Sequence, residues 1–515
     1  MPSASQDIST ETPIVWSIAG LDNSGCAGLL ADARVLQNFG AHLCAIASCT
    51  TAQNASQCLQ ISPLDATLMA EQLRSLQPDF MPHAIKIGAL ASNAAIQLVS
   101  ECIREFDCPV VHDPVLATSS GMAFLSDEDI QQLLTELLPQ VSILTPNISE
   151  AEQLTGIAIR SPTDVERAAA QLLTIGLGSV LIKGGHLAPD DADVCDYWSD
   201  GVRHFWLRHP LQDNPNTRGS GCALSSAIAA SLATDPNRND WPDIASAVVR
   251  GTAYISRAIE LAKPIQPSTN KSAGLNDTPV RGPVSNEEGT IELRHLPRLS
   301  EHFQAEDVQF SACDVAALGL YPVVDDVSWL GKLLPLGIQT IQLRIKDQSD
   351  SFLRQQIQQA VELQNQYGCR LFINDHWQLA LKYGAYGVHL GQEDLNGADL
   401  VAIAQAGLRL GVSTHSWFEL ARAHALSPSY IAFGPVYATT TKTMRFVPQG
   451  LQRLREWVTL LAERYPLVAI GGIDTSNAAE VLRTGVGSVA VVRAITEAPD
   501  TQVAVQDLQR LVDVA

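Results

Sequence analysis

Two aspartates in the C-terminal half of the chain lie at the ends of short apolar runs. Asp375 follows the run 371–373 closely, and Asp394 comes shortly after the run 387–389. A helix-length segment, 377–384, separates the runs, and this order predicts a strand, a helix and a second, parallel strand. Right-handed crossovers place the ends of such strands on one edge of the sheet, so the two carboxylates are expected to approach each other.

Paired carboxylates on one edge suit a hard divalent cation. Mg²⁺ prefers oxygen ligands and is usually shared between one or two carboxylates and substrate phosphates. Asp375 and Asp394 are therefore candidate Mg²⁺ ligands. The alternative is that each aspartate caps the helix that follows it, since Asp is a favoured N-cap residue. The presence of both residues, each after an apolar strand, favours the metal site.

Length and composition limit the remaining interpretations. A chain of 515 residues is too long for one core and predicts two domains. A net charge of −21 disfavours nucleic acid and anionic membranes as partners. The 10 cysteines form no CxxC pair, no apolar run would span a bilayer, and the polar residues 1–11 do not form a signal peptide. We expect a cytoplasmic protein.

The N-terminal half predicts an α/β fold with a largely parallel sheet. Apolar strand candidates separated by helical stretches lie at 14–19, 45–48, 84–87, 110–111, 141–144 and 180–182. A Gly-rich turn and a helix follow the first of these strands, as in nucleotide-binding folds. Ligands of such sheets bind beyond the carboxyl ends of the strands, where this sequence places its polar motifs.

Three charged residues follow successive strands of this half. Asp113 and Glu150 are candidate carboxylate ligands for Mg²⁺ near a phosphate tail, and Lys183 supplies a cation followed by two glycines that permit close approach to phosphate. The alternative is that Asp113 or Glu150 is a helix cap.

A fourth motif opens an apolar helix. Gly219 and Gly221 flank Ser220 and precede Cys222, so backbone N–H groups and the helix dipole form an anion site at this point. A transferring phosphoryl group would be stabilised there, with Cys222 beside the attacking hydroxyl. The alternative is that Cys222 is only a small packing residue.

Taken in order, these motifs resemble the ribokinase-like kinases, and specifically the hydroxymethylpyrimidine/phosphomethylpyrimidine kinases. The resemblance is carried by 18–25, 31–32, 52–54, 86–88, 113–115, 145–147, 183–186 and 219–222. It implies a ribokinase-like α/β sandwich that phosphorylates hydroxymethylpyrimidine with ATP, first to the monophosphate and then to the diphosphate. It also implies that Asp32 and Gln53 contact the aminopyrimidine, and that Cys222 takes the position of the basic Asp of sugar kinases.

The C-terminal half alternates strands and helices regularly. Strand candidates lie at 320–324, 340–343, 371–373, 387–389, 409–412, 430–433, 468–470 and 488–492. Eight βα repeats predict a TIM barrel. The polar residues after these strands include Gln342, Arg344, Lys346, Asn374, Ser413, Thr439, Thr441, Lys442 and Gly472. A single basic residue after a strand is more often a solvent-exposed charge on a loop than an anion ligand. Six strands that end in polar residues on one rim nevertheless favour an anion-binding site.

This half resembles thiamine-phosphate synthase over residues 314–500. The resemblance implies that the pyrimidine diphosphate contacts Gln342, Arg344, Lys346, Asn374, Ser413 and Lys442. It implies that Asp375 and Asp394 hold Mg²⁺, and that the thiazole phosphate contacts Thr439, Thr441 and Gly472. The sequence departs from the patterns of the two families at Cys26, Ala89 and Arg493.

The two resemblances together imply a bifunctional enzyme of thiamine biosynthesis. Residues from about 264 to 309 lose periodicity and gather Pro, Ser, Asn, Gly and Glu, which is typical of a linker. We predict a kinase over 12–285, a linker over 286–313 and a synthase barrel over 314–515. Two alternatives remain: a pyridoxal-type kinase joined to another phosphate-binding barrel, and a non-catalytic pyrimidine or thiamine sensor. The predicted partners are the small-molecule substrates, and a homo-oligomer is left open.

Overall fold

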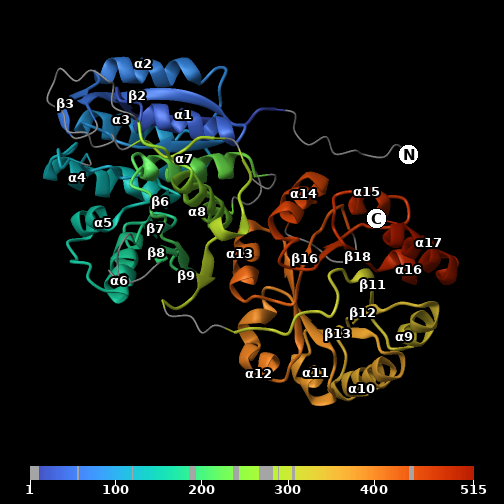
Figure 1. Cartoon of the computed structure of the whole chain (residues 1–515). Coiled ribbons are helices and arrows are strands. Elements are labelled where there is room, and N and C mark those ends of the chain that lie inside the picture. Colours follow the sequence, from blue (N-terminus) through green and yellow to red (C-terminus); the bar gives the residue numbers. More distant parts are fainter. Residues whose placement is uncertain are drawn as a thin grey trace. The chain divides into compact units, whose positions relative to one another are not determined.

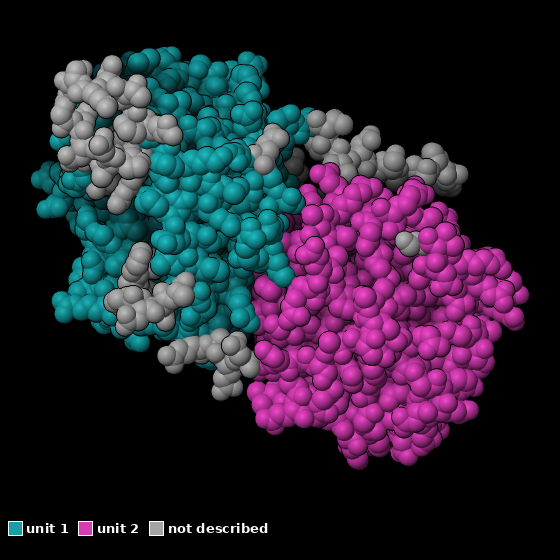
Figure 2. Space-filling view, viewed as in Figure 1, with its two compact units in different colours: residues 1–305 teal, residues 306–515 magenta. Residues whose placement is uncertain are grey.

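The computed structural model describes residues 11–54, 57–118, 120–184, 193–235, 243–265, 282–287, 289–303, 308–439 and 446–514. The chain divides into two compact units, residues 1–305 and 306–515 (Figure 2). Within the described ranges, no helix is both long enough and apolar enough to cross a membrane.

The first unit is built on one mixed sheet in the order β10-β9-β8-β7-β6-β5-β4-β1-β2-β3. Its strands are β1 Ile14–Asp22, β2 His42–Gln53, β3 Cys58–Pro63, β4 Ala84–Ile87, β5 Val110–His112, β6 Ile143–Leu144, β7 Val180–Ile182, β8 Asp193–Ser199, β9 His204–Pro210 and β10 Arg298–Ser300. The central strands run parallel, and β3, β8, β9 and β10 pair antiparallel at the edges.

Helices cover both faces of this sheet (Figure 1). They are α1 Gly28–Asn38, α2 Ala66–Leu76, α3 Asn93–Ile103, α4 Asp127–Gln132, α5 Ile148–Thr155, α6 Pro162–Leu173, α7 Ser220–Ala233 and α8 Ile244–Glu260. Every residue of α7 from 223 to 233 is buried, since this helix packs against α1, α8 and the central strands. Such a helix holds its N-terminus in a fixed place at the strand ends.

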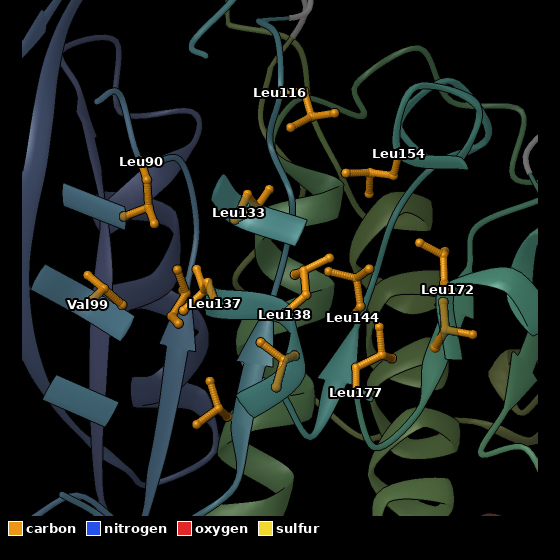
Figure 3. Close-up of a cluster of buried hydrophobic side chains, with 14 of the residues drawn as sticks. Leu90, Val99, Leu116, Leu133, Leu137, Leu138, Leu144, Leu154, Leu172 and Leu177 are labelled. Carbon is orange, nitrogen blue, oxygen red and sulfur yellow. The ribbon is translucent and has the colours of Figure 1, made fainter. Parts of the chain in front are cut away.

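A leucine-rich core fills the other face of the sheet. Figure 3 shows Leu137, Leu144 and Leu172 of this cluster gathered between the strands and the neighbouring helices. Burial of one such side chain is worth about 1.5–3 kcal/mol, so the core anchors strand β5, which Asp113 follows, and helix α5, which carries Glu150.

The segment 291–300 packs on the first unit although it lies within the predicted linker. Its last strand, β10, pairs with β9 through Arg298 opposite Arg208 and Ser300 opposite Trp206. The predicted domain boundaries stay a prediction.

The second unit is a closed barrel of eight parallel strands in sequence order. The strands are β11 Gly319–Val324, β12 Thr340–Leu343, β13 Arg370–Asn374, β14 Gly387–Leu390, β15 Arg409–Thr414, β16 Tyr430–Phe433, β17 Leu467–Ile470 and β18 Ser488–Val491. The helices around it are α9 Ser328–Leu333, α10 Asp350–Tyr367, α11 Trp377–Tyr383, α12 Leu400–Gln405, α13 Trp417–Ala425, α14 Gly450–Leu461, α15 Ala478–Leu482, α16 Arg493–Thr496 and α17 Thr501–Val514. Parallel strands bring all eight carboxyl ends to one rim.

All eight predicted barrel strands and the six strands predicted in the first unit are confirmed within a few residues. The antiparallel edge strands were not predicted. In β8, for example, charged Asp193 and Asp196 interrupt the apolar residues, so the segment lacks the continuous apolar run that marks a buried strand.

Candidate active sites

The carboxyl-terminal rim of the barrel brings together the residues singled out first. Asp375 follows β13 directly, and Asp394 begins the short 3₁₀ turn η6 (Asp394–Gly397) after β14. Lys346, which follows β12, forms an ion pair with Asp375 across the rim. Asn374, the last residue of β13, is buried beneath them. The predicted approach of the strand ends is therefore confirmed.

Neither aspartate caps a helix. The N-cap of α11 is His376 and that of η6 is Glu393, and neither turn is capped by a side chain. Asp375 instead adopts a left-handed backbone conformation, φ +62°, in which L-residues are rare. Because neither aspartate is an N-cap and neither turn has a side-chain cap bond, the capping alternative is wrong for both residues.

The two carboxylates repel each other. The pKa of Asp394 is raised by partial burial and by the facing carboxylate of Asp375, and it is lowered by Lys346. The lack of a side chain at Gly391 makes space for the carboxylate of Asp394, because a Cβ at position 391 would lie 3.0 Å from its Oδ2. Two facing carboxylates with incomplete charge compensation fit a Mg²⁺ ion, which is commonly held by one or two carboxylates plus phosphate and water. The described residues contain no group of three or more His, Cys, Asp and Glu that could hold a metal.

Other predicted residues lie on the same rim. The side chain of Gln342 is buried inside the barrel, and Ser413 lies near the end of β15 with its hydroxyl 2.8 Å from Nε2 of His389. Arg344 follows β12 and is half-buried. His389 was not among the predicted site residues. A polar histidine in an otherwise apolar strand is the pattern that could have indicated it.

The loops after β16 and β17 also meet. Gly472 has φ +66°, and a Cβ there would lie 2.6 Å from the carbonyl oxygen of Ala438, next to Thr439. This close approach requires glycine and brings two predicted phosphate-binding segments together. Thr441 and Lys442 lie outside the described residues. Arg493 is exposed at the start of α16.

In the first unit, Asp113 follows β5 and Lys183 follows β7, the strands on either side of β6, and their side chains form a salt bridge of 3.0 Å. Gly221 faces them, because a Cβ there would lie 3.2 Å from Nζ of Lys183 and 3.5 Å from Oδ2 of Asp113. The pKa of Asp113 is lowered by Lys183 and also by Lys86 against the effect of burial. A charged pair thus faces the N-terminus of α7.

Glu150 belongs to the same cluster and also caps a helix. Its carboxylate accepts from the backbone N–H of Asn147 at 2.8 Å, and Asn147 Oδ1 accepts from the N–H of Glu150 at 2.9 Å. The capping alternative is therefore confirmed for Glu150. Burial, together with the charge of Asp113, raises its pKa to about 7 despite Lys183. Its predicted metal-binding role stays a prediction.

The start of α7 is arranged as an open anion site. Gly219 is the N-cap with φ +75°, and no side chain caps the helix. A Cβ on Gly219 would lie 2.1 Å from the carbonyl oxygen of Cys26, so only glycine allows this approach. Cys222 lies in the first turn, where burial raises the pKa of its thiol to about 12 and Lys86 lowers it in part. At neutral pH the group is therefore a thiol.

Asp32 occupies a different environment from the predicted one. It is fully buried, with Oδ2 accepting from Lys86 at 2.9 Å and Ser17 at 2.7 Å, and Oδ1 accepting from Ser226 at 2.8 Å. These bonds engage both carboxylate oxygens and hold Asp32 in the core. Gln53 ends β2, where its N–H donates to Asn23. Direct contact of Asp32 or Gln53 with a pyrimidine stays a prediction.

Comparison with known families accounts for both units. Residues 22–274 match the sequence model of the phosphomethylpyrimidine kinase family, and residues 320–495 match that of the thiamine monophosphate synthase family. The chain belongs to both families. We call residues 1–305 the kinase unit and residues 306–515 the synthase unit.

Individual relatives match one unit or the other. Thiamine-phosphate synthase of Serratia proteamaculans is 57% identical over 196 residues, which are 38% of this chain and 92% of that protein. Phosphomethylpyrimidine kinase of Clostridium difficile is 31% identical, covering 48% of this chain and 100% of that chain with a TM-score of 0.42. A pyridoxal kinase of Staphylococcus aureus, whose structure was solved with ADP, is 26% identical to this chain. The match covers 54% of this chain and 94% of the pyridoxal kinase, with a TM-score of 0.46.

The predicted families, fold class and enzyme class are thereby confirmed. The chain is a bifunctional enzyme of thiamine biosynthesis, with a ribokinase-like phosphomethylpyrimidine kinase and a TIM-barrel thiamine-phosphate synthase.

Two buried histidines predict a loss of stability in mild acid. Burial lowers the pKa of His112 in the kinase unit and of His389 in the synthase unit to about 4, against 6.5 for a free imidazole. Between these values the unfolded chain binds more protons than the folded chain, so stability is present above pH 6.5 and is lost as pH falls towards 4. When the pH is lowered from 7 to 5, each histidine should reduce the free energy of unfolding of its unit by about 2 kcal/mol.

Urea unfolding of the wild type and of His112→Gln at the two pH values measures this effect. The variant should lose less stability on acidification than the wild type. His42→Gln, at an exposed histidine of the same unit, is the matched control. An equal pH dependence in all three proteins would contradict the prediction.

Proposed function

We propose that the kinase unit phosphorylates hydroxymethylpyrimidine twice with ATP, and that the synthase unit joins the resulting diphosphate to thiazole phosphate. The observation that carries the proposal is the barrel rim, where Asp375, Asp394 and Lys346 converge without capping a helix. Mg²⁺ and ATP are the proposed cofactor and phosphoryl donor, and the reaction is proposed to take place in the cytoplasm.

The synthase reaction requires a stabilised leaving group. The bond between the pyrimidine methylene carbon and the diphosphate oxygen breaks, and the electron pair leaves with the diphosphate. The thiazole nitrogen then attacks the resulting pyrimidinylmethyl cation, so no proton is transferred and no nucleophilic side chain is needed. Arg344, Lys346 and Ser413 are proposed to hold the leaving diphosphate, and Asp375 and Asp394 the Mg²⁺, which would neutralise charge as the bond breaks.

The remaining rim residues are proposed to orient the two substrates. Gln342, Asn374 and Lys442 would contact the diphosphate, and Thr439, Thr441 and Gly472 the thiazole phosphate. The approach of Gly472 to Ala438 supports this assignment, because it places the two phosphate-binding loops side by side. Holding the rings in line supplies much of the rate enhancement, since it removes the entropic cost of their encounter.

The kinase reaction is proposed to use the N-terminus of α7. In the first transfer the substrate hydroxyl oxygen attacks the γ-phosphorus of ATP, the bond from that phosphorus to ADP breaks, and the hydroxyl proton is released to water. In the second transfer a phosphate oxygen of the monophosphate attacks a second ATP in the same way. Catalysis of such a loose transfer is mostly positioning and charge stabilisation. Lys183, Gly219 and Gly221 are proposed to surround the phosphoryl group, Cys222 to hold the hydroxyl by hydrogen bonding, and Asp113 and Glu150 to bind Mg²⁺.

Gly221→Ala separates site geometry from stability. Gly221 is the second residue of α7, so Ala should stabilise the helix by up to about 1 kcal/mol, the value for a helix interior. Its methyl group would nevertheless lie 3.2 Å from Nζ of Lys183 and displace the cation or the phosphoryl group. We expect kinase activity to fall about fivefold with thermal stability kept or increased.

The matched control is Gly331→Ala. Gly331 lies in helix α9, where a Cβ meets no atom within 4 Å, so both activities should be retained. Full kinase activity in Gly221→Ala would contradict the proposal that the phosphoryl group binds at the start of α7.

The pyridoxal-type alternative is tested with a substrate panel. Hydroxymethylpyrimidine, its monophosphate and pyridoxal are offered separately with ATP to the full chain. We expect the two pyrimidines to be preferred, and a preference for pyridoxal would favour the alternative.

A further inference from the structure

Five side chains form a continuous chain of hydrogen bonds through the barrel interior. Gln342 Nε2 lies 3.4 Å from the hydroxyl of Tyr321, which lies 2.8 Å from the hydroxyl of Tyr430. The Tyr430 hydroxyl lies 2.7 Å from Nδ1 of His389, and Nε2 of His389 lies 2.8 Å from Oγ of Ser413. Each residue comes from a different strand, so the chain connects β12, β11, β16, β14 and β15.

Packing fixes the rings of this chain. Tyr321 and Tyr430 are 1% and 0% exposed, and Tyr430 packs edge-on against Phe372 with ring centroids 4.9 Å apart. Gly411 makes room for Tyr430, because a Cβ there would lie 2.2 Å from the tyrosine ring. The hydroxyls therefore have few alternative partners, and the order of the chain is set by the fold.

The chain also has a direction. An amide nitrogen only donates, so Gln342 donates to Tyr321. The direction that then gives each buried hydroxyl proton an acceptor runs from Tyr321 to Tyr430 and from Tyr430 to Nδ1 of His389. With Nδ1 accepting from Tyr430, the neutral imidazole of His389 carries its proton on Nε2. It then donates to Ser413, whose own proton is left free to point away from the imidazole.

We propose that Tyr321, Tyr430 and His389 are positioning residues that hold Ser413 as a hydrogen-bond donor towards the diphosphate leaving group. The inference rests on the proposed synthase function, which places Ser413 at the diphosphate. With the opposite direction of the chain, Ser413 would donate to His389 and present only lone pairs to an anion, which would repel it. The fold thus determines that Ser413 donates a hydrogen bond to the diphosphate, and it does so through side chains that do not touch the substrate.

Tyr430→Phe tests the chain because it removes one hydroxyl and leaves the ring. We expect kcat/KM for the pyrimidine diphosphate to fall about tenfold, since a hydrogen bond to a charged group loses its fixed donor. In a Ser413→Ala background the same substitution should cost less than about twofold, because its effect passes through Ser413. The KM for thiazole phosphate should not change.

Tyr386→Phe is the matched control. Tyr386 packs against Phe372 in the same aromatic cluster, but its hydroxyl donates to Asp314 at 2.7 Å, outside the chain. This variant should keep wild-type kinetics. If Tyr430→Phe does not fold, Tyr321→Phe breaks the chain one step further from Ser413 and should cost about threefold.

Binding of inorganic diphosphate with Mg²⁺ gives a second readout that does not need turnover. Calorimetric titration of the full chain should show about tenfold weaker binding for Tyr430→Phe and no further weakening in the Ser413→Ala background. Losses that add up in the double variant, or an unchanged Tyr430→Phe, would overturn the inference. A wild type that binds diphosphate but forms no thiamine phosphate would instead overturn the proposed function.

Discussion

Replacing Asp394 by Asn is expected to lower formation of thiamine phosphate from preformed pyrimidine diphosphate about a hundredfold. The substitution removes a charge with little change of shape, so it weakens metal binding and the stabilisation of the departing diphosphate. Loss of one such contact costs about 3 kcal/mol in the transition state. Initial rates with thiazole phosphate and saturating Mg²⁺ measure the loss, and pyrimidine phosphorylation by the same variant should be unchanged.

Asp399→Asn is the matched control for this substitution. Asp399 does cap a helix, since its carboxylate accepts from the N–H of Ala402 at 2.9 Å at the start of α12. Asn is an equally good cap, so this variant should keep its activity and stability. Asp375→Asn should behave like Asp394→Asn. If both Asp375→Asn and Asp394→Asn form thiamine phosphate at the wild-type rate, the proposal that these two residues bind Mg²⁺ is contradicted.

Replacing Cys222 by Ala is expected to lower both phosphorylation steps about thirtyfold while leaving the synthase reaction intact. The thiol lies in the first turn of α7, where we propose that the phosphoryl group is transferred, and a contact worth about 2 kcal/mol would be lost with it. ATP-dependent turnover of hydroxymethylpyrimidine and of its monophosphate, followed separately, measures the effect.

The charge state of Cys222 adds a second expectation. Because burial raises the pKa of the thiol to about 12, the wild-type rate should show no thiol ionisation near neutral pH. Cys222→Ser should retain more activity than Cys222→Ala, since it keeps a hydrogen-bonding group. Cys102→Ala, a change at a buried cysteine of α3, is the matched control. Unchanged turnover in Cys222→Ala would reduce Cys222 to a packing residue.

The sequence predicted where the carboxyl ends of the barrel strands lie, because βα repeats fix their place. Once the runs before Asp375 and Asp394 are recognised as neighbouring parallel strands, topology alone brings the two carboxylates together. The same reasoning located Lys346 and Gly472. It could not exclude helix capping, because that depends on backbone angles such as the φ of +62° at Asp375.

Pairing between distant residues was not predictable from the pattern. The family resemblance implies that Asp32 contacts the substrate, and this stays a prediction; the structure shows that Lys86 from β4 pairs with it in the core. Burying a carboxylate is costly unless it is paired, and the sequence does not show which cation pairs with it. Tyr321 and Tyr430 were taken as ordinary apolar strand residues, since only the closed barrel brings their hydroxyls together.

One reaction mixture tests the bifunctional assignment directly. The full chain is incubated with hydroxymethylpyrimidine, thiazole phosphate, ATP and Mg²⁺, and thiamine phosphate is measured over time. We predict that thiamine phosphate forms, that omission of ATP abolishes it unless preformed pyrimidine diphosphate is supplied, and that Asp394→Asn lets the diphosphate accumulate. Failure to form thiamine phosphate from either the alcohol or the preformed diphosphate would contradict the proposed function.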